Sequence, residues 1–316
     1  MKNNAKEEMK ASAIFGIIVF GLLLMALIIP LATAPNIVGH NYKNVTVNTR
    51  VNITNSKPEI LNMSVYDASN SSLVNFTITA GSTRTIYCNA TVRDWNGFND
   101  ITNVSGVLYH VPTSSYGAAD DNNSHYSNSS CTLNASLSNF TGWYVCAFDI
   151  YYYANNGTWN CNMTVQDTYN KTGTGNRTTG FTPVYSLNVT DGIDYGNVGV
   201  EEFSIEQVAN ITNLGNMAIN ITLEGYGVTR GDGLAMNCSI QGNITIANER
   251  YASNPGVPWA SKTALTSGTT TRLNITMPKQ TDPGTQVVNS TYWELFIPPN
   301  PAGNCTGFVI FTAIAP

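Results

Sequence analysis

The chain has 316 residues, of which only 11% are charged, and its formal net charge is -5. Because soluble proteins usually carry about 25% charged residues, amides and hydroxyls must supply most of the polar surface here. The 15 Lys and Arg residues are too few and too scattered to form a basic stripe, which excludes a nucleic-acid partner.

Residues 1–34 are predicted to form a signal peptide or a signal-anchor helix. Lys2, Lys6 and Lys10 precede an apolar run that extends over residues 11–29. That length spans a bilayer, which favours a retained anchor over a cleaved signal peptide. A pilin-type leader cut near Lys10 also fits. The basic end is expected inside, which places the rest of the chain on the extracellular side of the cytoplasmic membrane.

Residues 44–55 alternate apolar and polar side chains with the period of a half-buried β-strand. The polar parity holds Asn, Thr and Arg. The same nearly uncharged alternation suits a strand that leaves its own domain and completes the sheet of a neighbour. The apolar residues share one parity: Val45, Val47, Val51 and Ile53.

Residues 45–180 are predicted to form an Ig-like β-sandwich, because short β-rich runs alternate with clusters of Asn, Gly, Ser and Asp. Around Cys88 and Cys161 every second residue is apolar, so both cysteines are expected to face the core. The stretch TGTGNRTTG at 172–180 is interpreted as a linker.

The loop RDWNGFND, residues 93–100, is the candidate metal site. Asp94, Asn96 and Asp100 offer oxygen ligands of the kind that calcium prefers. Gly97 allows a sharp bend between them. The distal Glu of an EF-hand is absent, and an Asx-rich turn explains the same residues. The turn is the favoured interpretation, with calcium as the alternative and no other cofactor expected.

Residues 183–316 are predicted to form a second β-sandwich with the same strand character. Within it, DYGNVGV from Asp194 and TNLGN from Thr212 resemble the "D-F-G-x-V-x-V-G … T-N-x-G-N" signature of Ig-like surface and anchor modules in prokaryotes. Glu201 stands where that pattern has Gly. The runs VRDWNGFNDI and YWELFIPPNPAGNCTG also resemble cell-surface proteins of small-genome archaea. The resemblance implies an archaeal envelope protein and no particular chemistry.

The six cysteines are an even number, as expected for disulfides in an exported protein, although sequence alone allows 15 connectivities. Pairing the last two with each other keeps each predicted domain closed on itself. The favoured pairs are Cys88 with Cys161, Cys131 with Cys146, and Cys238 with Cys305.

Asn-x-Ser/Thr sequons, the acceptors of N-glycosylation, occur 23 times among 40 Asn residues. On a strand, the Asn and the hydroxyl residue share the outer face while the middle residue points inward. Because Thr also favours β-strands, strand propensity alone accounts for part of these sequons. The predicted strand-face glycosylation sites are Asn44, Asn52, Asn62, Asn75, Asn89, Asn103, Asn162, Asn188, Asn220, Asn243 and Asn274.

The sequence as a whole predicts an all-β chain with two Ig-like β-sandwich domains after an N-terminal hydrophobic helix. The three histidines are scattered and no Gly-x-Ser-x-Gly elbow occurs, so an enzyme is not expected. The expected function is that of an anchored, N-glycosylated cell-surface protein that acts by structure and by interaction. Its expected partners are the membrane, covalent glycans, and either itself or another surface protein. The alternatives are a filament or coat subunit assembled by strand donation, and a carbohydrate-binding or adhesive module.

Overall fold

The computed structural model describes residues 46–69 and 74–316. This part of the chain is all-β, and its helices are three 3-10 turns. Among the described residues, no helix has the length and hydropathy that crossing a bilayer requires. The predicted helix within 1–34 and the predicted site Asn44 lie outside the described residues. The three turns are η1 (Phe98–Asp100), η2 (Ile246–Asn248) and η3 (Trp259–Ser261).

The chain divides into two compact units, Met1–Ile53 and Thr54–Pro316. The second unit contains two separate hydrophobic cores, one built from β1–β9 and one from β10–β20. We call these strand sets the N-terminal sandwich and the C-terminal sandwich. The domain boundaries at 45–180 and 183–316 stay predictions, because residues 54–316 form one unit.

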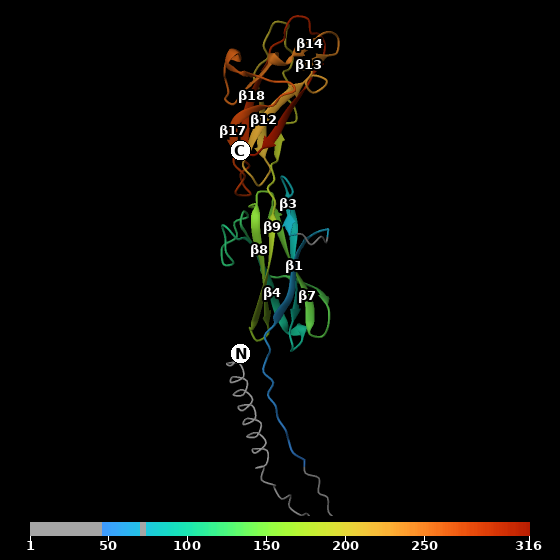
Figure 1. Cartoon of the computed structure of the whole chain (residues 1–316), viewed down its shortest axis with the longest axis vertical. Helices are drawn as coiled ribbons and strands as arrows, with labels where there is room; N and C mark the ends of the chain where they lie inside the picture. Colours follow the sequence, from blue (N-terminus) through green and yellow to red (C-terminus); the bar gives the residue numbers. More distant parts are fainter. Residues whose placement is uncertain (1–45, 70–73) are drawn as a thin grey trace, which may run out of the picture. The chain divides into compact units, whose positions relative to one another are not determined.

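The N-terminal sandwich packs two sheets around one core (Figure 1). Its strands are β1 (Glu59–Asp67), β2 (Asn75–Phe76), β3 (Thr83–Arg93), β4 (Ile101–His110), β5 (His125–Asn128), β6 (Thr132–Ser136), β7 (Thr141–Tyr151), β8 (Gly157–Asp167) and β9 (Thr172–Phe181). One sheet has the order β1-β3-β7-β6, and the other has the order β2-β9-β8-β4-β5. Among the described strands, β2 and β9 form the only parallel pair.

Alternating side chains build this core as the sequence predicts. Cys88 on β3 and Cys161 on β8 are fully buried and form a disulfide that joins the two sheets. Trp159 lies on the same face of β8 two residues before Cys161 and is also fully buried. The apolar parity of both strands therefore faces inward, as expected for half-buried strands.

The interpretation of 172–180 as a linker was wrong. These residues belong to β9, which pairs along its length with β8. Its glycines permit close packing: a Cβ on Gly173 would lie 2.2 Å from the carbonyl oxygen of Pro58, and one on Gly175 would lie 2.9 Å from the sulfur of Met63. The small residues thus mark a tight approach to the opposite sheet and do not mark a flexible connection.

The C-terminal sandwich surrounds the second core with three sheets. Its strands are β10 (Leu187–Val189), β11 (Gln207–Asn213), β12 (Ile219–Tyr226), β13 (Leu234–Cys238), β14 (Asn243–Thr245), β15 (Glu249–Ala252), β16 (Thr263–Ala264), β17 (Thr271–Met277), β18 (Val288–Leu295), β19 (Cys305–Thr306) and β20 (Phe308–Ile314). The sheet orders are β10-β11-β18-β15-β16, β17-β12-β20 and β14-β13-β19. Strand β12 is buried along almost its whole length.

The other two disulfides are also the pairs that the sequence favours. Cys131 bonds to Cys146 of β7 across 15 residues of sequence. Cys238 of β13 bonds to Cys305 of β19, its direct cross-strand neighbour. The described part of the chain contains no free cysteine.

The prediction of a half-buried strand over 44–55 was wrong for the part that the structure describes. Residues 46–55 belong to no strand. The apolar side chains are open to solvent, with exposed fractions of 75% for Val47, 83% for Val51 and 79% for Ile53. The period of the sequence sets which residues share a face, but it supplies no partner strand.

Candidate functional site

Three carboxyl groups meet at one end of the N-terminal sandwich. Asp94 directly follows β3, Asp100 ends η1, and Asp167 ends β8. Ligand oxygens of the three residues all lie within 4.8 Å of one another. The antiparallel pairing of β4 with β8 places Ile101 opposite Asp167, which brings the neighbouring Asp100 to the same end of the sheet. We call these three residues the carboxylate cluster.

Local hydrogen bonds hold each carboxylate in place. Oδ1 of Asp94 accepts the N–H of Asn96 at 2.8 Å, which forms an Asx turn closed by Gly97 at a φ of 120°. Oδ1 of Asp167 accepts the N–H groups of Tyr169 and Lys171, each at 2.8 Å. These bonds fix the side chains from the loop and from the strand end.

Several oxygens at the cluster have no hydrogen-bond partner. Oδ2 of Asp94 and Oδ2 of Asp100 are buried and accept no hydrogen bond. Asn55 donates its amide N–H to Oδ2 of Asp167 at 2.6 Å, while its own Oδ1 is buried without a partner. Oδ1 of Asp100 accepts the hydroxyl of Thr168, so the acceptors of the cluster that stay without a donor are the two Oδ2 atoms of Asp94 and Asp100.

The cluster also lacks a counter-charge. Among the described residues, none of the ion pairs involves Asp94, Asp100 or Asp167. The neighbouring Arg93 is engaged with Glu59 at 2.7 Å. Burial raises the pKa of Asp94 above its ordinary value, and the two nearby carboxylates raise it further, against the opposing N–H of Asn96.

The structure brings together two of the three predicted metal ligands. Asp94 and Asp100 lie in the cluster, whereas the exposed Asn96 accepts the backbone N–H of Ser56 at 2.7 Å. The sequence analysis missed Asp167 and Asn55. Asp167 stands at the end of an alternating strand on the buried parity, where a charged residue needs a reason. An acidic residue on the buried parity of a strand was therefore the sequence signal that could have identified Asp167.

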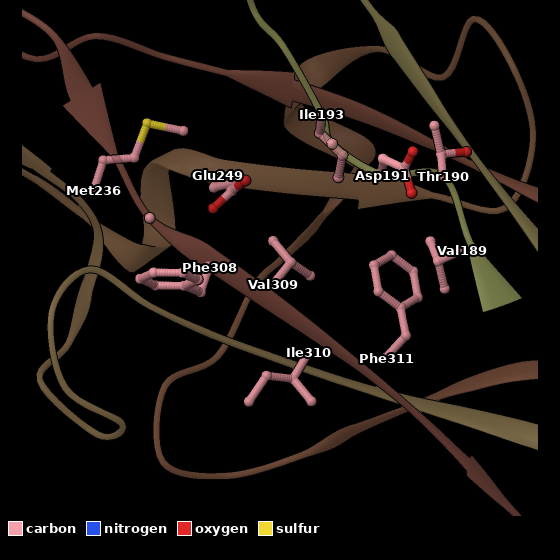
Figure 2. Close-up of a pocket in the computed structure, with 12 residues that line it drawn as sticks. Val189, Thr190, Asp191, Ile193, Met236, Glu249, Phe308, Val309, Ile310 and Phe311 are labelled. Carbon is pink, nitrogen blue, oxygen red and sulfur yellow. The ribbon is translucent and has the colours of Figure 1, made fainter. Parts of the chain in front are cut away.

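A groove opens at the edge of the C-terminal sandwich, with a volume of about 480 Å³ (Figure 2). Val189 of β10 lies on one side and Phe308–Phe311 of β20 on the other. Both strands are at the edge of their sheets, and β20 pairs with β12 alone among the described strands. Two edge strands with unpaired backbone groups therefore border a groove whose lining is partly apolar and partly polar.

Two carboxyl groups line this groove, the exposed Asp191 and the buried Glu249. Glu249 is 3% exposed, and its Oε1 accepts the hydroxyl of Tyr195 at 2.8 Å. Burial raises the pKa of Glu249 to about 7, although the hydrogen bond from Tyr195 favours the ionised form. A second groove of about 750 Å³ also includes Ile193 and Met236, so the two grooves share part of their lining.

The predicted glycosylation sites differ in exposure. Asn89 and Asn162 are half-buried. Asn220 is only 4% exposed, and its amide lies 2.9 Å from the hydroxyl of Thr276. The prediction of an outward-facing Asn220 was wrong, because β12 lies between β17 and β20 and is covered on both faces. The exposed sites are Asn52, Asn62, Asn75, Asn103, Asn188, Asn243 and Asn274.

Comparisons with known proteins give distant structural similarity. No family model matches the chain, and no curated protein matches it. It is similar to the CsuC-CsuE chaperone-tip adhesion subunit complex of Acinetobacter baumannii Csu pili, with a TM-score of 0.37, 11% identity, and coverage of 76% of this chain and 96% of that chain.

Two streptococcal C-terminal domains are also similar in structure. For BspA, an AgI/II polypeptide of Streptococcus agalactiae, the TM-score is 0.23 with 12% identity over 81% of this chain and 95% of that chain. For AspA, an antigen I/II-family protein of Streptococcus pyogenes, the TM-score is 0.25 with 10% identity over 82% and 99%. These TM-scores are too low to carry an argument about this chain.

Proposed function

We propose that the chain is an extracellular surface protein that acts through structure and interaction and not through catalysis. A helix within 1–34 anchors it to the membrane, and N-glycans cover its sandwiches. The observation that carries this proposal is the division of strand faces: Asn75 and Asn243 are exposed, while the next residues, Phe76 and Ile244, are fully buried. Each such sequon thus joins a core residue to a sugar acceptor.

If the folded chain carries N-glycans, exposed sequons should be modified and the buried Asn220 should not. Mass spectrometry of the native protein should find glycans on Asn75, Asn103 and Asn243 and none on Asn220. The first three side chains are exposed. A glycan on Asn220 would have to displace the strands on either side of β12, so the folded chain excludes it. Unmodified asparagine at most exposed sites would contradict the proposal.

The remaining expectations belong to the same proposal. The low charge content and the three disulfides support an exported protein. The archaeal origin rests on the sequence resemblance alone. A carbohydrate-binding role rests on the sequence alone, since no observation among the described residues favours it.

A second candidate function is that of a polymer subunit assembled by strand donation. The observation that favours it is the exposure of Val47, Val51 and Ile53 in residues 46–53, which lie outside the compact unit Thr54–Pro316. The occupant of the groove beside β20 would be this segment of a second copy. Its apolar parity would enter the groove, and its backbone would pair with the free edge of β20.

Strand donation predicts concentration-dependent self-association of the full chain in detergent. The variant Val51→Asp/Ile53→Asp should weaken self-association by about 100-fold or more, because burying each of these side chains contributes roughly 1.5–3 kcal/mol. Asn48→Asp, on the opposite parity and outside any sequon, is the matched control and should associate like the wild type. Sedimentation analysis measures both. A wild-type chain that stays monomeric at every concentration would exclude this function.

A further inference from the structure

The carboxylate cluster combines buried negative charge with unused acceptors. Asp94 is fully buried, and its Oδ2 has no hydrogen-bond partner. Oδ2 of Asp100 and Oδ1 of Asn55 are likewise buried and without partners. Unpartnered buried acceptors are rare in native proteins, because each one loses its hydration without compensation. Two of them belong to the carboxylate cluster and the third belongs to a residue that is hydrogen-bonded to it, so a common explanation is required.

The chemistry of the site identifies what is missing. All the unpartnered atoms are oxygens, and three of the four residues are acids. A buried carboxylate is stable only when it is paired with a cation, heavily hydrogen-bonded or protonated. The described side chains supply no cation in contact, since Arg93 is paired with Glu59. A proton shared between Oδ2 of Asp94 and Oδ2 of Asp100 would satisfy those two acceptors, but it would leave two negative charges without a cation and Oδ1 of Asn55 without a partner.

We propose that the carboxylate cluster binds a hard divalent cation of the size of calcium, with Asp94, Asp100, Asp167 and Asn55 as its protein ligands. Calcium takes six to eight oxygen ligands, and it accepts carboxylates and amide carbonyls from separate segments. Magnesium demands a stricter octahedral geometry and retains its water more strongly. This inference goes beyond the proposed surface function and does not depend on it.

The ligands come from three separate parts of the chain. Asp94 and Asp100 flank the β3–β4 loop, and Asp167 ends β8. Asn55 belongs to the segment that leads into β1, where the adjacent Ser56 is already bonded to Asn96. A cation at the cluster would therefore fasten the start of the compact unit to the sandwich. It would strengthen the point at which residues 46–53 continue into the fold.

Calcium titration of the full chain in detergent tests the inference. The melting temperature should rise by about 5 °C at 5 mM calcium, as expected from mass action for a site of extracellular affinity. Hydrogen exchange at Ser56 should slow on addition of calcium. Asp94→Asn keeps the shape of the side chain but removes its charge, so it should weaken calcium binding by about 100-fold and abolish both changes. Magnesium should bind at least about tenfold more weakly.

The control variant is Asp191→Asn, which removes an exposed carboxylate far away in the sequence and should bind calcium like the wild type. A wild-type chain that shows neither a melting shift nor binding heat at 5 mM calcium would overturn the proposal. Equal calcium binding by wild type and Asp94→Asn would also overturn it, since the cation would then lie elsewhere. Equal affinity for magnesium would overturn the assignment to calcium.

Discussion

Replacing both Cys88 and Cys161 by alanine is expected to lower the free energy of unfolding by about 4 kcal/mol. The bond spans 73 residues of sequence, and closing a loop of that length removes conformational entropy from the unfolded chain. Both cysteines are fully buried, so the alanines also leave space in the core that adds to the loss. Chemical denaturation under non-reducing conditions measures the change.

The matched comparison is the variant that lacks the Cys131–Cys146 bond. This loop spans 15 residues, for which the same model gives about 3 kcal/mol, and Cys131 is only half-buried. The variant without the Cys88–Cys161 bond should therefore be the less stable of the two. The reverse order, or a loss below about 1 kcal/mol for Cys88→Ala/Cys161→Ala, would show that the inter-sheet bond does not limit unfolding.

The sequence was sufficient to predict which side chains of β3 and β8 face the core. Around Cys88 and Cys161 the alternation of side chains agrees with burial residue by residue. The reason is local, because a strand always turns successive side chains to opposite faces. The faces alone do not fix the partner of Cys88, because Cys146 is also fully buried and lies directly opposite Cys88 on β7.

Long-range packing explains where the prediction failed. The glycines of 172–180 look like those of a linker, yet Gly173 and Gly175 allow the opposite sheet to approach β9. Residues 46–55 alternate as a strand does and pair with nothing in the described chain. The sequon at Asn220 predicts an outward-facing side chain, but β12 lies in the middle of its sheet. Sequence periodicity contains no information about what covers each face.

Only the ligands of the candidate metal site that lie close together in the sequence were predictable. Asp94 and Asp100 belong to one turn, whereas Asp167 and Asn55 arrive through the pairing of β4 with β8 and through the lead into β1. Glu201 shows a converse case: it occupies a left-handed conformation, with a φ of 65°, at the position where the resembled signature has glycine. The motif thus identified a backbone requirement that this chain meets with a different residue.

Glu249 is expected to make the stability of the chain depend on pH. Its pKa is raised from 4.5 to about 7 in the folded protein, so the folded state holds its proton more tightly than the unfolded chain does. The resulting stabilisation is fully present below pH 4.5 and is lost as the pH rises through about 7. A shift of this size corresponds to about 3 kcal/mol between the two limits.

The variant Glu249→Gln isolates this effect. Glutamine stays neutral at every pH and can still accept the hydroxyl of Tyr195, so the variant should lack this part of the pH dependence and be more stable than the wild type at pH 8. Urea unfolding at pH 5 and pH 8 measures the difference between the two proteins, in which other titrating groups such as Asp94 cancel. Asp191→Asn, an exposed carboxylate of the same groove, should behave like the wild type. Parallel pH profiles for wild type and Glu249→Gln would mean that the carboxyl is solvated through the groove, because only contact with water would keep its pKa near the ordinary value.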